Sequence, residues 1–353
     1  MKNLKKVLSL VLALAMALSL MTAAFAADAS DYKDYSKVTY KEAVDVMTAA
    51  GIFNGGDGNN FNPDATLNRE QAAKIITYML VGQTQADKLT TTIAPYSDVA
   101  ATRWSAGSIA YCTNEGIIAG DGNGRFNPTA GVTGLQFAKM LLVALGYDAE
   151  IEKLVGNSWA INTAKLAASA GLDKGLDVSL SAALTREQAA QMAFNAMKAN
   201  IVEYDTQTNI DIGGGSSIVI GNKKAYNVTT SRDWGKNIYN DPEKEGGSGY
   251  IVQFAEQYCR DLELNETATT ADSFGRPAHK WSYDNDKVGT YADKAVLTYT
   301  TEFKGTELAD DIDDAGCEFA KKDGKYNEVK IVRNGGEANT MKDAEISALL
   351  DSS

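Results

Sequence analysis

The chain has 353 residues, with 34 basic and 46 acidic side chains and a formal net charge of −12. This balance argues against a nucleic-acid partner, which needs a basic surface to displace counterions. One histidine and three cysteines without CxxC spacing argue against a zinc site, and three cysteines are too few for a disulfide scaffold.

Residues 1–26 are predicted to be a secretory signal peptide. Three lysines precede the apolar run VLSLVLALAMALSLM, and the segment closes with Ala24-Phe25-Ala26. A membrane anchor is the alternative, but the apolar run is short for a span. Without this segment 327 residues remain, with a net charge of −15, and we expect no transmembrane segment after cleavage. That length predicts two or three domains.

A heptapeptide occurs three times in the following part of the chain. It reads LNREQAA at 67–73, VTGLQFA at 132–138 and LTREQAA at 184–190. Each copy follows a helix-like run, and the first two also follow a loop, GDGNNFNP or GDGNGRFNP. Repetition at this spacing predicts three helix–loop–helix units. We place repeat 1 at 36–91, repeat 2 at 92–150 and repeat 3 at 151–204.

The second helix of each repeat has one apolar stripe at i, i+3, i+4, i+7 and i+8. No single repeat can bury such a stripe, whereas three stripes around a common axis can. The sequence therefore predicts an all-α, pseudo-threefold bundle with three central helices. The stripes consist of Ala72, Ile75, Ile76, Met79 and Leu80; Phe137, Met140, Leu141, Ala144 and Leu145; and Ala189, Met192, Ala193, Ala196 and Met197.

The start of each second helix has the spacing of a capping box, in the pairs Asn68–Gln71, Thr133–Gln136 and Thr185–Gln188. Arg69 and Arg186 follow two of these caps, where the helix dipole prefers anions, and repeat 2 has no arginine there. We therefore expect the arginines to hold an external anion together with free backbone N–H groups of the helix. An ion pair with an adjacent glutamate or a loop acid is the alternative.

The pattern Trp-x-x-x-x-Ile/Ala, Gly-Ile, Gly-Asp-Gly, Phe-x-Pro and Leu/Val-Thr-Arg-Glu-Gln-Ala resembles the S-layer homology (SLH) domain, over roughly residues 36–204. Three SLH repeats usually occur together, as a three-pronged spindle with the second helices at its centre. The resemblance implies non-covalent anchoring of an exported protein to a secondary cell-wall polysaccharide of a Gram-positive-type envelope. In that family the polymer often carries pyruvylated, and so anionic, sugars, which agrees with the anion sites expected above.

The resemblance implies five polysaccharide-binding residues. Arg69 and Arg186 match the arginine of the family motif, and Trp104 and Trp159 match a tryptophan at the start of the first helix. A ring there could stack on a sugar while the arginine holds its carboxylate; a hydrophobic cap over the bundle is the alternative. Asp98 matches an aspartate that could accept a sugar hydroxyl, or could cap the following helix.

Each repeat departs from the family pattern. Repeat 1 has Thr39 in place of the tryptophan, repeat 2 has Gly134-Leu135 in place of Arg-Glu, and repeat 3 lacks the Gly-Asp-Gly and Phe-x-Pro loop. We therefore expect fewer functional grooves than repeats. The GDGN loops lack the alternating acids of a calcium loop, so they are predicted to be turns built on glycine and Asn-Pro.

After the repeats, residues 205–217 contain a triple glycine and are predicted to be a linker. Residues 218–353 are predicted to form an α+β or mainly β module, so the chain as a whole is α+β. Strands are expected in 218–230, 279–291 and 295–303, with a hairpin turn at DNDK, and helices in 249–259, 305–316 and 340–350. Cys259 and Cys317 form either a disulfide or two buried thiols.

The sequence favours anchoring over catalysis. It has no Gly-x-Ser-x-Gly, His-Glu-x-x-His or phosphate-loop motif, so we predict no catalytic residue, metal or cofactor. His279 is predicted to be a strand residue, and the acidic run ELADDIDDAGCE a solvated helix face or, less simply, a calcium site. The segment DSFGRPAHKWSY resembles segments that follow SLH triplets in clostridial surface proteins. Two alternatives are a wall-anchored enzyme acting on glycans through residues 205–353, and a self-associating subunit of a surface lattice.

Overall fold

The computed structural model describes the three repeats almost completely, and the rest of the chain in part. The described residues are 28–56, 58–204, 208–213, 216–220, 224–230, 244–245, 249–265, 278–293, 307–308, 310–311, 321–322, 325–326, 329–332 and 338–350. The predicted signal peptide lies outside them. Within these ranges no helix is long and apolar enough to cross a membrane. The chain divides into one unit of Met1–Leu264 with Ser282–Val288 and a second of Asn265–Trp281 with Gly289–Ser353.

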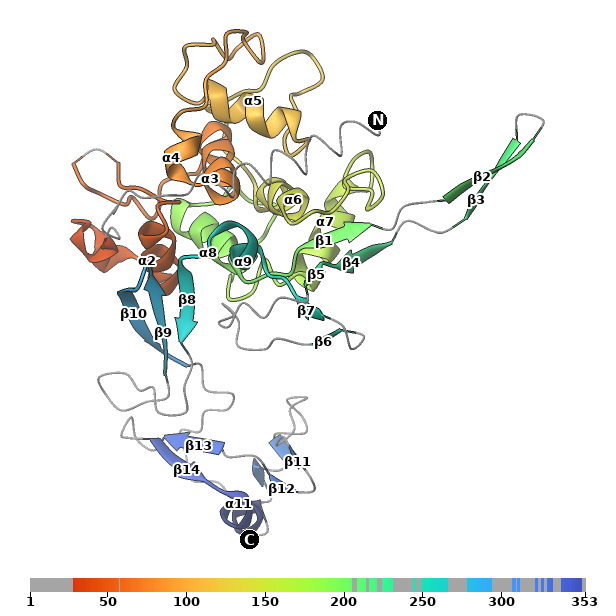
Figure 1. The fold of residues 1–353 in the computed structure, drawn as a ribbon. Helices are drawn as coiled ribbons and strands as arrows, with labels where there is room; N and C mark the ends of the chain where they lie inside the picture. Colours follow the sequence, from red (N-terminus) through yellow and green to blue (C-terminus); the bar gives the residue numbers. More distant parts are fainter. Residues whose placement is uncertain are drawn as a thin grey trace. The chain divides into compact units, whose positions relative to one another are not determined.

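Each repeat contains two main helices, which follow one another in chain order (Figure 1). All three predicted capping boxes are confirmed, because the cap side chain accepts from N3 and the N3 glutamine accepts from the cap backbone. The helices are α2 (Lys41–Ala49) and α3 (Arg69–Val81); α5 (Ala106–Asn114) and α6 (Gly134–Ala144); α7 (Trp159–Ser169) and α8 (Arg186–Met197), with the short η1 (Ala29–Asp31), η2 (Tyr35–Lys37) and α4 (Gln83–Ala86).

The predicted apolar stripes of α3, α6 and α8 are buried, except for Leu80, which is partly exposed. The segments that lead into these helices are joined by a closed ring of backbone hydrogen bonds. Leu67 N–H donates to the Leu184 carbonyl (2.9 Å), Leu184 N–H to Val132 (3.0 Å), and Val132 N–H to Leu67 (2.9 Å). Each segment thus plays the same part relative to the other two, so the starts of the three helices are related by a pseudo-threefold arrangement.

The first helix of each repeat packs on the second helix of the preceding repeat. Helix α5 contacts α3, α7 contacts α6, and α2 contacts α8. The order is cyclic, from repeat 1 to 2, 2 to 3, and 3 back to 1. A repeat therefore buries its apolar stripe against a neighbour, as expected from the sequence.

The first compact unit continues past residue 204, because the following segments pack on the helices. Ile201 N–H donates to Val252 (3.0 Å), Val252 N–H to Val228 (2.9 Å), and Val228 N–H to Ile201 (2.9 Å), in a second closed ring. The short helix α9 (Phe254–Tyr258) then contacts α3 and α8, with Phe254 completely buried.

Small antiparallel sheets make up most of the remaining described structure (Figure 1), and the α+β class is confirmed. Part of the predicted linker is a strand, since β2 (Thr208–Gly213) pairs with β3 (Ser216–Ile220). The other pairings are β1 (Val202–Tyr204) with β4 (Ala225–Asn227); β5 (Thr229–Thr230), β6 (Lys244–Glu245) and β7 (Gly249–Ile251) in the order β5-β7-β6; and β8 (Leu262–Asn265), β9 (Ala278–Tyr283) and β10 (Asp286–Ala292) in the order β10-β9-β8.

Predictions for residues 218–353 have mixed outcomes. The DNDK turn is confirmed, with Asp284 and Asn285 at φ of 50° and 68° between β9 and β10, as a two-residue hairpin turn requires. The expected helix at 249–259 begins as strand β7 and becomes helical only at α9. The expected strand at 295–303 lies outside the described residues. The last described elements are β11 (Lys321–Lys322), β12 (Lys325–Tyr326), β13 (Val329–Val332), β14 (Ala338–Met341) and α11 (Asp343–Leu350).

Cys259 was expected to be either in a disulfide or a buried thiol. In the structure it is a free, half-buried thiol. Cys112 is also a free thiol and is buried on α5. Cys317 and most of the acidic run lie outside the described residues; residues 307–308 and 310–311 of that run are helical.

Replacing Phe254 with alanine should destabilise the first unit by about 3–5 kcal/mol, because it empties a fully buried aromatic site between α9 and the bundle. Chemical denaturation followed by circular dichroism at the helix signal measures the change. Ile161→Ala, on a side chain 64% exposed, is the control and should cost under about 0.5 kcal/mol. Equal stability of the two variants would show that α9 does not belong to the cooperative unit.

Candidate functional site

The N-termini of α3 and α8 are bonded to the loop of the next repeat. Arg69 N–H donates to the Ala130 carbonyl (2.9 Å) and Glu70 N–H to Pro128 (3.0 Å). In α8, the N–H groups of Arg186 and Glu187 make the same bonds to Ala65 (2.9 Å) and Pro63 (3.2 Å). These N–H groups, which we expected to bind an external anion, therefore already have hydrogen-bond partners inside the fold.

The arginine side chains reach further into the same loops. Arg69 Nε donates to the Phe126 carbonyl (2.8 Å) and Nη2 to the Ala119 carbonyl (2.9 Å), with the guanidinium 4.5 Å from the centre of the Phe126 ring. Arg69 therefore bonds carbonyls on both sides of the Gly-rich loop of repeat 2 and packs over an aromatic ring. The sequence did not predict these contacts.

Arg186 repeats this arrangement one interface further round. Its Nε donates to the Phe61 carbonyl (2.9 Å) and its Nη2 to the Asn54 carbonyl (3.0 Å), with the guanidinium 5.2 Å from the Phe61 ring. No carboxylate of a described residue lies within ion-pair distance of Arg69 or Arg186, and the described residues give Nη1 of neither side chain a hydrogen bond. The ion-pair alternative is therefore not what these residues show.

Both guanidinium groups carry a partly desolvated positive charge. Burial lowers the pKa of Arg69, and the neighbouring Tyr96, Asp121 and Asp98 act in the opposite direction. Burial also lowers the pKa of Arg186. Arginine stays protonated in proteins, so the charge persists and is met here mainly by carbonyl dipoles. An anion reaching the Nη1 side would be attracted to it.

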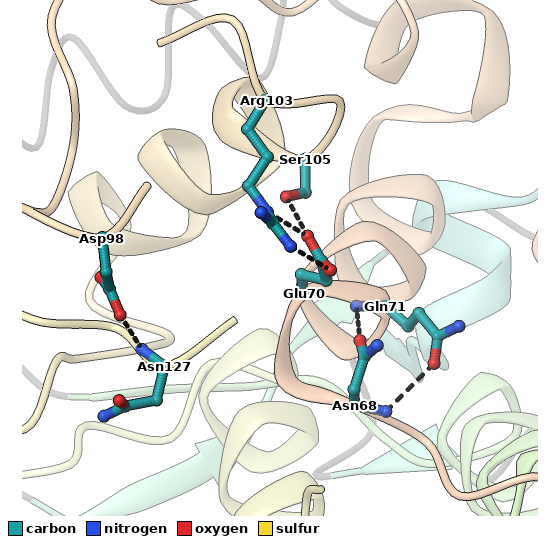
Figure 2. Close-up of polar contacts among 7 residues, drawn as sticks. All are labelled: Asn68, Glu70, Gln71, Asp98, Arg103, Ser105 and Asn127. Atoms are coloured by element: carbon teal, nitrogen blue, oxygen red, sulfur yellow. Dashed lines mark hydrogen bonds and ion pairs between the residues drawn. The ribbon is translucent and has the colours of Figure 1, made fainter. Parts of the chain in front are cut away.

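The glutamate next to each arginine binds the first helix of the next repeat, as Figure 2 shows for Glu70. Glu70 is 3% exposed and accepts from Arg103 at 2.7 and 2.8 Å and from Ser105 Oγ at 2.6 Å, at the start of α5. Burial alone would raise the pKa of Glu70, but these hydrogen bonds outweigh it and lower the pKa. The result is an ion pair between buried Glu70 and partly exposed Arg103 that joins repeats 1 and 2.

Glu187 does the corresponding work between repeats 3 and 1. Its Oε2 accepts the backbone N–H groups of Thr39 (2.7 Å) and Tyr40 (3.4 Å), at the start of α2. Sequence reasoning missed both glutamates. The signal was present, since Arg and Glu are lost together from the heptapeptide of repeat 2.

Asp98 holds the loop of its own repeat. Its two carboxylate oxygens accept the N–H groups of Phe126 (2.8 Å) and Asn127 (2.7 Å), the latter drawn in Figure 2. It does not cap α5, whose N-cap is Ser105. Asp34, just before repeat 1, makes the same pair of bonds to Phe61 and Asn62, both at 2.7 Å. Sequence reasoning missed Asp34, although Tyr-x-Asp at 32–34 and 96–98 marks both sites.

The GDGN loops are turns, as predicted. Left-handed φ values occur at Gly58 (72°), Asn62 (57°), Gly122 (83°) and Asn127 (57°), which glycine and asparagine tolerate best. Among the described residues no group of His, Cys, Asp or Glu side chains is arranged to hold a metal ion. His279 lies in strand β9, as predicted, with its Nδ1 2.7 Å from an Asp293 carboxylate oxygen.

The two predicted tryptophans lie in different surroundings. Trp104 precedes α5 and is 57% exposed, so it is not a buried cap of the bundle. Trp104 is next to Arg103 in the sequence, and Glu70 is next to Arg69. The Arg103–Glu70 ion pair therefore brings Trp104 and Arg69 to the same boundary between repeats 1 and 2, which we call the 1–2 interface. Trp159 begins α7 and is partly buried.

The other two boundaries are incomplete. At the 2–3 interface α7, which begins at Trp159, packs on α6, whose first residue is Gly134 rather than arginine. At the 3–1 interface Arg186 meets repeat 1, which has Thr39 in the tryptophan position. Arginine and tryptophan therefore occur together only at the 1–2 interface.

Repeat 2 lacks an arginine because the third repeat lacks the loop that it would hold. Gly134 N–H donates to Ala182 (3.0 Å) and Leu135 N–H to Leu180 (2.7 Å), so the short segment of repeat 3 lies directly against α6. A Cβ on Gly134 would be 2.8 Å from Leu180 Cα, which is closer than real Cβ atoms approach backbone. The missing arginine in repeat 2 and the missing loop in repeat 3 therefore belong to the same interface, where the short segment occupies the space that the arginine side chain would need.

Residues 31–73 and 95–138 match the family model of the S-layer homology domain. The chain is 25% identical over 317 residues to a "Cell surface protein" of Thermoanaerobacter kivui, covering 87% of this chain and 40% of that protein. It is 27% identical over 214 residues to a "Surface layer protein" of Brevibacillus choshinensis, covering 60% and 19%, and 26% identical over 265 residues to a "Surface-layer 125 kDa protein" of Lysinibacillus sphaericus, covering 70% and 21%. The chain thus spans less than half the length of these curated relatives.

Replacing Glu70 with glutamine should lower stability at neutral pH by about 2–4 kcal/mol, because a buried partner of Arg103 and Ser105 loses its charge. Since the folded pKa of Glu70 is depressed, its contribution is present above the ordinary glutamate value of about 4.3 and is lost as pH falls through the folded value. The melting temperature of the wild type should therefore fall more steeply below pH 4 than that of E70Q. Parallel curves, with Asp64→Asn as a surface control, would contradict this role.

Proposed function

We propose that this chain attaches an exported protein to the cell wall by binding an anionic secondary cell-wall polysaccharide at the 1–2 interface. The observation that carries the proposal is the coincidence of Arg69 and the exposed Trp104 at a boundary between the two repeats that match the SLH family. The polymer class comes from the family resemblance, and its pyruvylated form would supply the anion.

The geometry supports a division of labour between the two side chains. Arg69 is fixed by two carbonyls and an aromatic ring, which leaves its Nη1 edge as the donor for a carboxylate. Trp104 offers an exposed aromatic face, and such a face packs on the apolar side of a sugar ring. A charged sugar spanning the two would gain both contacts with little reorganisation of the protein.

Arg186 and Trp159 are the other contacts expected from the sequence, and we propose that they contribute little. Arg186 faces a repeat with Thr39 instead of tryptophan, and Trp159 lies at an interface without arginine. Of the three boundaries, one would then carry most of the affinity. The oxygens of Asp98 already accept two loop N–H groups, so we do not include Asp98 among the sugar contacts.

The family match and the surface-layer relatives support a location at the cell wall or cell surface. The relatives' names describe surface and cell-wall proteins rather than enzymes, which favours anchoring over the glycan-hydrolase alternative. The names "Surface layer protein" and "Surface-layer 125 kDa protein" also favour a second candidate function, a subunit of a self-associating surface lattice. Electron microscopy of the purified chain tests this second candidate, since a lattice subunit should form ordered sheets.

Trp104→Ala should reduce co-sedimentation of the chain with purified cell walls, raising the apparent Kd by about tenfold or more, as expected for an aromatic anchor. The side chain is mostly exposed, so the variant should unfold like the wild type. Trp159→Ala is the matched control and should bind within about twofold of the wild type. Pelleting of the wild type should disappear when the wall polymer is removed chemically.

Two outcomes would overturn the proposal. The first is wild-type pelleting that persists on stripped walls, which would place the ligand outside the polysaccharide. The second is equal loss of binding in the Trp104 and Trp159 variants, or in neither, which would remove the 1–2 interface as the site.

A further inference from the structure

We propose that Asp98 is a positioning residue, which fixes the Arg69 guanidinium at the polysaccharide site by holding the Phe126–Asn127 peptide group between them. The inference rests on the proposed function, because it assigns how that site is kept in shape. It also replaces the expectation that Asp98 contacts a sugar hydroxyl directly.

Phe126 is held from both sides. Its N–H donates to Asp98 Oδ1 (2.8 Å), and its carbonyl accepts from Arg69 Nε (2.8 Å). Its ring is stacked on Tyr96 at 5.4 Å between centroids and is covered by the guanidinium at 4.5 Å. The Phe126 carbonyl shares its peptide group with the Asn127 N–H, which donates to Asp98 Oδ2 (2.7 Å). Any rotation of this peptide group would break a bond to Asp98 and one to Arg69 together, so the orientation of the arginine depends on the aspartate.

The same three-part relay is built a second time in the chain. Asp34 accepts from Asn62 N–H (2.7 Å), and the Phe61 carbonyl of the same peptide group accepts from Arg186 Nε (2.9 Å). The rings of Tyr32 and Phe61 are also in contact, with centroids 5.6 Å apart, although they are tilted rather than stacked. A relay that recurs with matching atoms reflects a constraint of the fold and not an accident of one loop.

The third interface lacks the relay as a whole. Repeat 3 has no Phe-x-Pro loop, and the helix that would reach it begins with Gly134. Arginine and phenylalanine loop are thus present together at two interfaces and absent together at one. This is the pattern expected of parts that act on one another.

The charge of Asp98 makes the proposal testable by the sign of an effect. A negative group near Arg69 opposes an incoming anion, so neutralising it would strengthen binding if electrostatics were its main role. Asp98→Asn leaves one acceptor oxygen for two N–H groups, so the loop would lose one charge-assisted hydrogen bond. Positioning therefore predicts weaker binding, by about tenfold, in a variant from which electrostatics alone predicts tighter binding.

Two matched variants separate positioning from general damage. Asp34→Asn breaks the equivalent relay at the 3–1 interface, where tryptophan is missing, and should destabilise the chain as much as Asp98→Asn while keeping wall affinity near that of the wild type. Asp121→Asn removes a loop charge near Arg69, yet one oxygen of Asp121 accepts both backbone N–H groups, from Asn123 (2.8 Å) and Arg125 (3.2 Å), so an amide can keep both bonds. Its affinity should be unchanged or slightly higher.

The experiment measures co-sedimentation of the full chain with purified cell walls, together with ¹⁵N NMR of the arginine Nε–H groups. The Arg69 signal, assigned by its absence in Arg69→Lys, should exchange faster with solvent in Asp98→Asn and stay unchanged in Asp34→Asn, where the Arg186 signal should move instead. Unchanged or tighter wall binding by Asp98→Asn, equal loss in Asp34→Asn, or an unaltered Arg69 signal would each overturn the inference. The Trp104→Ala result is independent of the relay, so failure of the proposed function can be told apart.

Discussion

Each second helix of this protein begins by giving its first two backbone N–H groups to carbonyls of the next repeat, and the rest of the bundle depends on that contact. These donors have no partner within their own helix, and burying them unpaired would be costly. Because α3, α6 and α8 all use the same solution, the three repeats are interlocked in one cyclic direction. The first helices follow the same direction, each packing on the second helix of the repeat before it.

This interlock explains which sequence features vary together. Where the next repeat has a Gly-rich loop, an arginine clamps its carbonyls and a glutamate binds the helix beyond it, as Arg69 and Glu70 do. Where the loop is missing, Gly134 lets the shortened segment approach, and a side chain there would collide with Leu180. The residues at the start of the heptapeptide of one repeat therefore depend on the loop of the next repeat. Comparing the repeats one by one does not show this dependence.

Local features were predictable from the sequence, whereas partners between repeats were not. The capping pairs and apolar stripes follow from the 3.6-residue period and from side chains three apart, so Thr133 and Gln136 could be identified without a structure. The carbonyls of Ala119 and Phe126 carry no sequence signal, because every residue has one. The sequence around Arg69 therefore predicts an external anion or an ion pair, and not these internal partners. The cyclic packing of first helices was equally hidden, since it depends on the path of the loops.

In the proposed site, some residues that would bind the ligand also hold the repeats together. A substitution can therefore affect ligand binding, stability or both, depending on the residue. Arg69 supports the loop of repeat 2 and carries the proposed charge for the ligand, so its removal disturbs both at once. Trp104 is mostly exposed, so within the proposed site its removal should affect the ligand far more than the fold. Two repeats contribute to the proposed site, and the ion pair between buried Glu70 and partly exposed Arg103 joins them at the same boundary. If the proposed site anchors the chain, a force that pulls the protein from the wall would therefore act on the same boundary that holds the two repeats together.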